Sequence, residues 1–211
     1  MIRRSFTLLA AASVLATALP TLPAHAAAAS NDLFARMQRV NAGLHSYEAD
    51  VQVAIATHGP PYISPTLQGK AYFKQPDKTA VQFQSVPMLN DQLRKVVGQI
   101  EPPAEWGQLY VVTPTGDDGT TATFRLVRKK NGRIDHVDVK VDDKSATVTA
   151  MTYYYKDGGS IAFTQTYDQV GGNFVVKQQN GKVDIPHYNA DVTSTFSNYK
   201  VNIPVPDSVF S

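Results

Sequence analysis

A short run of acidic and imidazole side chains, Asp135-His136-Val137-Asp138, has the residue types that acid–base catalysis or metal binding requires. The run lies in a segment that alternates like a strand, where successive side chains point to opposite faces. His136 and Asp138 would therefore share one face, and Asp135 would lie on the other. We interpret this run as the solvated face of a hairpin strand.

The other reactive residues lack the spacing that a reaction centre needs. Asp142-Asp143 is typical of a turn and lacks the ligand spacing of a calcium loop. His187 follows Pro186, and no motif ties a serine or a carboxylate to it. Nucleophile elbows, His-Glu-x-x-His and phosphate-binding glycine loops are all absent from the sequence. We expect no enzymatic activity, no metal and no cofactor; a secreted hydrolase assembled from distant residues is the alternative.

The composition excludes several further classes of protein. The chain has no cysteine, which excludes disulfides, cysteine nucleophiles, iron–sulfur clusters and lipid attachment to an N-terminal cysteine. The formal net charge is only +2, and both arginines of the N-terminal leader would leave with it. We therefore expect no nucleic acid as a partner.

The N-terminal 26 residues have the organisation of an export signal. Arg3-Arg4 precedes an apolar run over residues 6–19, and Ala24-His25-Ala26 is a small-x-small cleavage pattern. The run is shorter than the roughly 20 residues that span a membrane. We expect cleavage near Ala26 and a periplasmic mature chain. An uncleaved anchor is the alternative, and the route could be general secretion or twin-arginine export.

Two helices are expected in the mature chain. Apolar residues recur at helical spacing over residues 32–43, after a capping Asn31, and again over residues 87–97, where Pro87 suits the first turn. Residues 101–106 are expected to be a proline-interrupted connection, in which Trp106 would be a hinge anchor or a ligand contact.

Almost everything else alternates with the period of two that is typical of strands. Strands are expected over residues 47–55, 67–74, 79–85, 109–113, 121–128, 134–141, 146–155, 160–167, 173–179 and 190–201. Asn131-Gly132 and Asn180-Gly181 are typical of hairpin turns, which predicts a meander and thus an antiparallel sheet. Tyr153-Tyr154-Tyr155 would place aromatic rings on both faces, either for sheet packing or for a pocket.

The predicted fold is mainly β (α+β): one domain over residues 27–211, with a large, strongly curved antiparallel sheet. About ten strands curl rather than stay flat, and the two helices are too few to cover a flat sheet. We therefore expect an unclosed half-barrel with a small helical lid on its concave face.

Several stretches resemble the periplasmic outer-membrane lipoprotein carriers, the LolA-like family. They are the first helix running into Ser46-Tyr47-Glu48-Ala49-Asp50-Val51, the strand that starts at Gln68-Gly69-Lys70 and ends at Gln75-Pro76-Asp77, Phe124-Arg125-Leu126-Val127-Arg128-Lys129, and the C-terminal Phe196–Asn202 with Pro206–Phe210. The resemblance implies an apolar concave face that holds the acyl chains of lipoproteins, with membrane-bound donor and acceptor proteins as partners. Gln75 stands where the family has an arginine that ties the lid shut.

On this resemblance we expect an apolar cavity on the concave face. Its predicted lining is Val51, Val53, Ala71, Phe73, Val81, Phe83, Leu93, Val97, Ile161, Phe163 and Phe196, with Gln75 as the lid-contact position. A filled core is the alternative, and the small Gly69 and Ala71 favour a cavity. The predicted function is a monomeric, non-enzymatic periplasmic carrier or binder of a lipid or lipoprotein acyl chain. A periplasmic sensor domain of the same fold, reading lipid or peptide, is the alternative.

Overall fold

The computed structural model describes residues 32–59, 62, 64–76, 78–84, 103–186 and 188–210. The predicted leader over residues 1–26, the predicted helix over residues 87–97 with Leu93 and Val97, and His187 lie outside the described residues.

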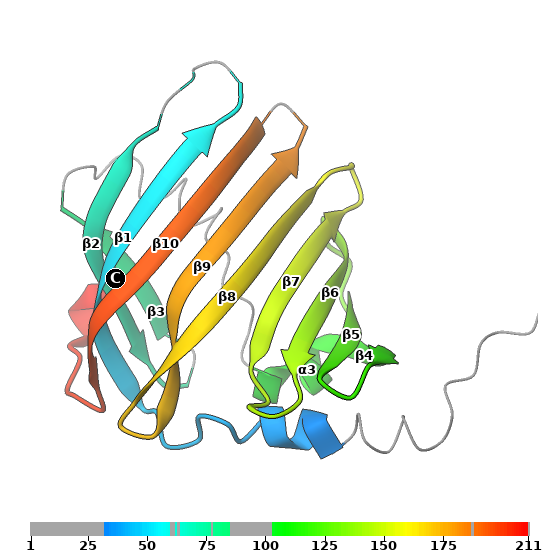
Figure 1. Ribbon diagram of the computed structural model, residues 1–211, viewed down its shortest axis with the longest axis horizontal. Helices are drawn as coiled ribbons and strands as arrows, with labels where there is room; N and C mark the ends of the chain where they lie inside the picture. Colours follow the sequence, from blue (N-terminus) through cyan, green and yellow to red (C-terminus); the bar gives the residue numbers. More distant parts are fainter. Residues whose placement is uncertain are drawn as a thin grey trace, which may run out of the picture.

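One antiparallel sheet of ten strands forms most of the described chain. The strands are β1 (Ser46–Thr57), β2 (Thr66–Lys74), β3 (Lys78–Phe83), β4 (Tyr110–Asp117), β5 (Thr121–Arg128), β6 (Ile134–Asp142), β7 (Val148–Tyr155), β8 (Ser160–Val170), β9 (Asn173–Ile185) and β10 (Tyr188–Val201). Their order is β3-β2-β1-β10-β9-β8-β7-β6-β5-β4, so β1 and β10 pair with each other inside the sheet, two strands from the β3 edge (Figure 1). Each predicted strand occurs, with ends that differ by a few residues.

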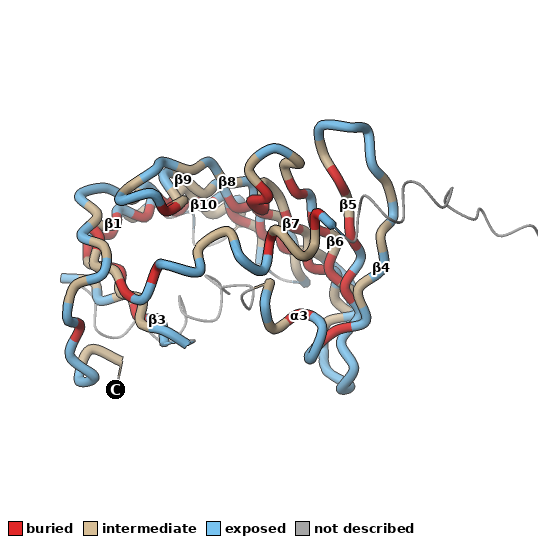
Figure 2. The backbone as a smooth tube through the Cα atoms, turned by 90° about the horizontal axis from the view of Figure 1, so that it is seen from below, coloured by how far each residue is buried: buried red, intermediate tan, exposed pale blue. Residues whose placement is uncertain are grey.

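The sheet is strongly curved and does not close. Seen from below, the strands arch across the molecule, with β3 at one lower side of the arch and α3 (Pro103–Leu109) at the other (Figure 2). We call the concave side of this arch the trough. The predicted half-barrel is thus confirmed.

A filled core occupies the part of the trough next to β4–β7. Leu33 and Met37, from the helix over residues 32–37, are almost fully buried, as are Trp106 of α3 and Phe124 of β5. The Phe34 ring stacks on Trp106, with ring centroids 6.3 Å apart. Trp106 is therefore a core residue and belongs to a helix, so the prediction of an irregular connection there was wrong.

The predicted first helix was too long. Only residues 32–37 are α-helical, and residues 38–43 form turns. Leu44 and Ala42 donate backbone hydrogen bonds to carbonyls three residues earlier, those of Asn41 and Arg39. The apolar spacing continues beyond the helix because these turns keep a period close to the helical one.

The prediction of a hairpin turn at Asn180-Gly181 was wrong. Gly181 lies inside β9, opposite Phe163 of β8 and Val192 of β10. A Cβ atom on Gly181 would lie 2.9 Å from Cε1 of Phe163. The glycine is required because the aromatic ring packs directly over its backbone, and the chain reverses later, between Ile185 and Tyr188. The strand reversal at Asn131-Gly132 is confirmed.

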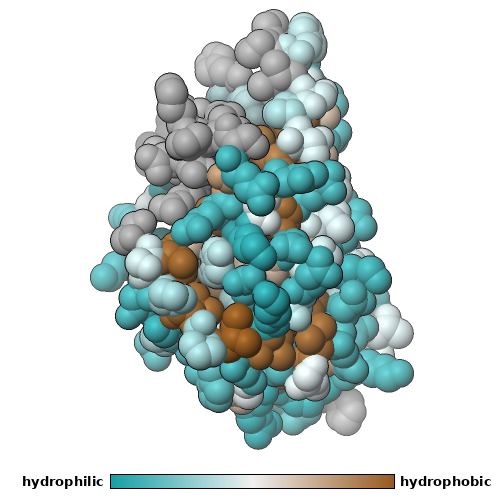
Figure 3. Space-filling model, turned by 90° about the vertical axis from the view of Figure 1, so that its left-hand side faces the viewer, coloured by the Kyte–Doolittle hydropathy of each residue, from teal (hydrophilic) through white to brown (hydrophobic). Residues whose placement is uncertain are grey.

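The C-terminal segment covers the outer face of the strands at one end of the sheet. It ends in the 3-10 helix η2 (Asp207–Phe210), whose Asp207 accepts hydrogen bonds from Lys74 and Lys78 at 2.9 and 3.1 Å. Figure 3 shows this side of the molecule, where polar side chains predominate and apolar residues gather in the lower part.

Candidate functional site

A pocket of about 450 Å³ lies at the lower end of the trough. Its described lining comes from the helix over residues 32–37 and the turns after it, from the adjacent ends of β1 and β2, and from the start of α3. The lining residues are Met37, Gln38, Val40, Asn41, Ala42, Leu44, Tyr47, Phe73, Gln75, Pro76, Pro103, Ala104 and Glu105. Most of them are apolar, and the volume lies in the range of small-molecule sites.

Residues 38–45, which we call the floor segment, run along the lower end of the sheet from the helix to β1 (Figure 1). Asn41 makes two hydrogen bonds with the backbone of Phe174. Its Nδ2 donates to the Phe174 carbonyl at 2.8 Å, and its Oδ1 accepts from the Phe174 amide at 3.0 Å. Asn202 likewise accepts from the His45 amide at 2.8 Å and donates to the Gly43 carbonyl at 2.9 Å. The floor segment is thus attached to the lower ends of β9 and β10.

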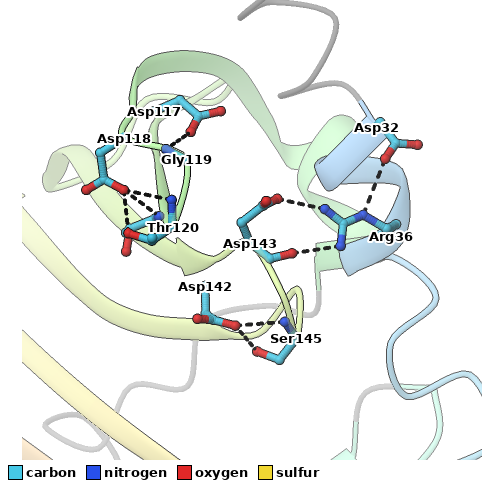
Figure 4. A network of polar contacts seen from close by, with 10 residues as sticks. Asp32, Arg36, Asp117, Asp118, Gly119, Thr120, Asp142, Asp143 and Ser145 are labelled. Atoms are coloured by element: carbon cyan, nitrogen blue, oxygen red, sulfur yellow. Dashed lines mark hydrogen bonds and ion pairs between the residues drawn. The ribbon is translucent and has the colours of Figure 1, made fainter.

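Arg36 attaches the preceding helix to the turn between β6 and β7 (Figure 4). Its guanidinium donates to the backbone carbonyl and to Oδ1 of Asp143, both at 2.7 Å. Because the helix and the floor segment are both tied to strand ends, the pocket has a defined wall on this side.

An aromatic group forms the opposite wall. Tyr47 and Phe73 are directly opposed on β1 and β2, and their rings stack with centroids 5.5 Å apart. Tyr199 meets Tyr47 edge-on at 5.3 Å and donates its hydroxyl proton to the carbonyl of Val176 at 2.7 Å. These rings are the polarisable, largely apolar surface that acyl chains and aromatic groups prefer.

The Tyr47 hydroxyl has no hydrogen-bond partner in the part of the chain that the structure describes. Burial raises the pKa of Tyr47 to about 12, so the hydroxyl stays protonated at any physiological pH. Tyr47 is half-buried, and a polar group withdrawn from water without a partner is unfavourable. A ligand that brings a hydrogen-bond acceptor into the pocket would satisfy it.

The charge of the pocket favours an uncharged ligand. Among its described lining residues Glu105 is acidic and none is basic. Among these described residues a carboxylate would find no cation to pair with, and burying an unpaired charge is costly.

Most of the predicted cavity residues lie on the trough face, but in two different settings. Val51, Val53, Ala71, Ile161 and Phe163 are buried in the core. Phe73, Val81, Phe83 and Phe196 are only half-buried. Of the predicted residues in the described ranges, Phe73 and Gln75 line the pocket.

The half-buried residues continue upward from the pocket along the trough face. In the first cross-strand row Phe73 opposes Tyr47, and in the next Val81 opposes Ala71. In the third row, Phe83, Gly69, Val51 and Phe196 follow one another across β3, β2, β1 and β10. We call Phe73, Val81, Phe83 and Phe196 the apolar strip.

Gly69 does not indicate a cavity, contrary to our expectation. A Cβ atom there would lie 2.2 Å from the backbone carbonyl oxygen of Gln82 in β3. The glycine is needed because β3 approaches β2 closely at this point.

Gln75 contacts the floor segment. Its backbone amide donates to the His45 carbonyl at 2.8 Å, and its side-chain Oε1 lies 3.0 Å from Nδ1 of His45. Sequence reasoning missed the floor segment and Tyr47 as parts of the site. The apolar spacing over residues 33–44 was visible, but it was assigned wholly to a helix.

His136 and Asp138 of the candidate acid–base run share the outer face, as predicted. The prediction that Asp135 lies on the opposite face was wrong, because a register shift between Ile134 and His136 brings Asp135 beside the imidazole. Asp135 and Asp138 flank His136 at 2.7 and 3.8 Å, and the imidazole stacks on Tyr154 with ring centroids 4.5 Å apart. Asp138 also receives two hydrogen bonds from Arg125, which hold the pKa of its carboxyl below the usual range. Tyr153 is buried on the trough face, so the three tyrosines serve sheet packing on both faces.

Three of the acidic residues drawn in Figure 4, Asp117, Asp118 and Asp142, close turns. Asp118 accepts hydrogen bonds from Thr120 and Thr121, and Asp142 accepts two from Ser145. Within the described ranges, no three histidine, cysteine or carboxylate side chains are placed to hold a metal ion. None of the helices there is long and apolar enough to cross a membrane.

The fold has counterparts among solved structures. A DUF1329 family protein from Desulfovibrio piger superposes with a TM-score of 0.64 at 14% identity, over 87% of this chain and 96% of its own. A LolA superfamily protein from Nitrosomonas europaea gives 0.60 at 11% identity, over 86% and 96%. A domain from Vibrio parahaemolyticus, assigned to outer membrane lipoprotein sorting, gives 0.64 at 11% identity, over 87% and 95%.

At these identities the likeness concerns the fold, and at that level the resemblance to LolA-like proteins is confirmed. No protein-family model matches the sequence, and no curated protein does.

Proposed function

We propose that this protein is a non-enzymatic carrier or binder of an acyl chain, which it holds in the pocket and along the apolar strip. The observation that carries the proposal is the continuity of these two features. The stacked Tyr47–Phe73 pair lines the pocket, and the half-buried Val81, Phe83 and Phe196 extend the same surface over the next rows of the sheet.

Binding would come from apolar burial, which yields about 25 cal/mol per Å² before the costs of association. The half-buried side chains still expose apolar surface that an acyl chain would cover. The core beside β4–β7 is already filled, so that part of the trough would serve as a rigid support.

The cellular setting belongs to the same proposal. The export signal expected over residues 1–26 would place the mature domain in the periplasm. The superposition on an outer membrane lipoprotein-sorting domain supports a lipidated protein or a lipid as cargo, and donor and acceptor proteins at the two membranes would then load and unload it.

The proposal is tested by introducing a charge into the pocket wall. In Phe73→Asp, the carboxylate would replace the ring that stacks on Tyr47, and an acyl chain could enter only by desolvating it. We expect Phe73→Asp to lose uptake of a fluorescent fatty-acyl ester probe while it keeps most of its thermal stability, because Phe73 is half-buried.

Two matched variants make the test decisive. Phe73→Leu keeps the wall apolar and should retain probe uptake. Phe124→Asp places the same charge in the filled core and should unfold the domain. If the wild type takes up no probe, and Phe73→Asp unfolds as Phe124→Asp does, the trough is a filled core and the carrier proposal is wrong.

A further inference from the structure

We propose that the outer face of β4–β7 is a docking surface for a membrane rich in anionic phospholipid. This surface is separate from the pocket, and the inference does not depend on the acyl-binding proposal. It rests on where the exposed apolar side chains and the basic residues gather.

Exposed large apolar side chains concentrate on this face. Six of them are more than a third exposed in the described ranges, and four lie here: Leu109, Val111, Val127 and Tyr154. Val111 is 55% exposed and Val127 is 41% exposed, and the two are directly opposed on β4 and β5. Their neighbours in the chain, Tyr110 and Leu126, point into the core, so the valines point outward.

The row continues across the next two strands. His136 of β6 opposes Tyr154 of β7, and the tyrosine ring is 39% exposed and stacks on the imidazole. Leu109, the last residue of α3 and two positions before Val111 in the chain, adds a further exposed aliphatic side chain. We call Leu109, Val111, Val127 and Tyr154 the outer apolar row.

Positive charge adjoins this row. Residues 125–133 contain five basic residues and no acidic one, although the whole chain has a net charge of only +2. Asp138 pairs with Arg125, and Asp157 pairs with Arg133. Lys129 and Lys130, at the turn between β5 and β6, are exposed and make no ion pair with a described residue.

This combination matches the chemistry of an anionic bilayer surface. Aliphatic side chains enter the boundary between headgroups and acyl chains, tyrosine prefers the interface, and lysine and arginine pair with lipid phosphates. The outer face lies on the convex side of the arch (Figure 2), a shape that a deformable lipid surface can follow.

The test is co-sedimentation of the purified protein with lipid vesicles. We expect binding to vesicles of phosphatidylglycerol and phosphatidylcholine, at least tenfold weaker binding to phosphatidylcholine alone, and weakening by added salt. Val111→Asp should reduce binding about tenfold, and so should the double change Lys129→Glu with Lys130→Glu. Tyr188→Ser, at a side chain of similar exposure on β10, is the matched control and should bind as the wild type does.

The double lysine variant covers the case in which Val111→Asp loses stability, because both lysines are exposed at a turn. All these variants should take up the acyl probe as the wild type does. Failure of the membrane-docking inference would change vesicle binding, whereas failure of the carrier proposal would change probe uptake. Equal binding to both kinds of vesicle, no binding by the wild type, or full binding by the lysine variant would each overturn the proposal. In the last two cases, retention by an immobilised acidic protein would point to a protein partner.

Discussion

At the scale of single residues, Tyr47 and Phe73 differ from the other aromatic side chains of the trough. Phe124 and Trp106 are fully buried in the core, whereas the Tyr47–Phe73 pair lines the pocket. Tyr47 also carries the hydroxyl that makes no hydrogen bond within the described ranges. We expect this group to orient a ligand by donating a hydrogen bond to an ester or amide carbonyl.

Tyr47→Phe should therefore weaken binding of an acyl ester without destabilising the domain. One hydrogen bond is worth about 1 kcal/mol, so the dissociation constant should rise roughly fivefold. The titration should be repeated with the free fatty acid, which we expect to bind more weakly than the ester because no basic side chain is among the described lining residues of the pocket.

Tyr199→Phe is the matched control for this change. The Tyr199 hydroxyl donates to Val176, so its removal should lower the free energy of unfolding by about 1 kcal/mol and leave the ester preference intact. Unchanged ester binding by Tyr47→Phe would show that the hydroxyl does not contact the ligand.

At the scale of elements, β9 shows how a strand can continue through a sequence that resembles a turn. Gly181 is followed and preceded by residues paired with both β8 and β10, and the Phe163 ring occupies the space that a side chain would need. The register of three strands therefore depends on a residue without a Cβ atom.

Gly181→Ala should lower the free energy of unfolding by about 1–3 kcal/mol, because the methyl group and the Phe163 ring cannot both fit without a shift. Urea unfolding followed by circular dichroism measures the change. Gly132→Ala is the control, since nothing lies within 4 Å of the Cβ position there. If Gly181 lay in a hairpin turn as Gly132 does, the two substitutions would change the free energy of unfolding by equal amounts.

The short helix α3 has one buried side chain, that of Trp106. Trp106 is fully buried and stacks on Phe34, which lies in the helix over residues 32–37. This contact joins two helical segments that are far apart in the sequence. The first packs on β5, where Phe34 meets Phe124, and α3 contacts β4.

Trp106→Ala should cost about 3–5 kcal/mol of unfolding free energy, as large aromatic truncations in a core do. The same urea titration applies, with Val111→Ala as the exposed control, which should change stability by less than about 0.5 kcal/mol. A loss below about 1 kcal/mol in Trp106→Ala would mean that α3 is not attached through this residue.

At the scale of the whole molecule, the open curved sheet partly withdraws several tyrosines from water: Tyr47 and Tyr199, whose rings are in contact, and Tyr167 on β8. Burial raises the pKa of Tyr47 to about 12 and also raises the pKa values of Tyr167 and Tyr199. In the unfolded chain tyrosine ionises near pH 10. Above that pH the unfolded state binds fewer protons than the folded state does, and stability falls as the pH rises.

We therefore expect the free energy of unfolding to decrease steadily above about pH 10. Lys70 adds to this trend, because hydrogen bonds from its ammonium group to Glu48 and Asp50 raise its pKa. Titration of tyrosinate absorbance separates the two contributions: the folded protein should ionise fewer of its ten tyrosines at a given pH than the protein in denaturant. Identical titration curves in the two states would contradict the burial of these rings.

Local patterns in the sequence were sufficient to predict the strands and the fold class. The alternation of period two marked each strand, because a half-buried strand must place apolar side chains on one face. Asn131-Gly132 marked a reversal of the chain, which the structure places between β5 and β6. The large number of predicted strands and the small amount of predicted helix indicated a curved sheet. These features depend on neighbours in the chain, which is why the sequence alone determines them.

The site depended on contacts between distant segments. Asn180-Gly181 has the composition of a turn, and only the packing of Phe163 shows why β9 continues. The pocket arises because the floor segment is tied to Phe174 and Asn202, which brings it against Tyr47 and Phe73. Strand pairing likewise decided the outer apolar row, since Val111 and Val127 become neighbours only through the register of β4 and β5. Such contacts join residues that the local pattern cannot relate, because the curvature and register of the sheet set the distance between them.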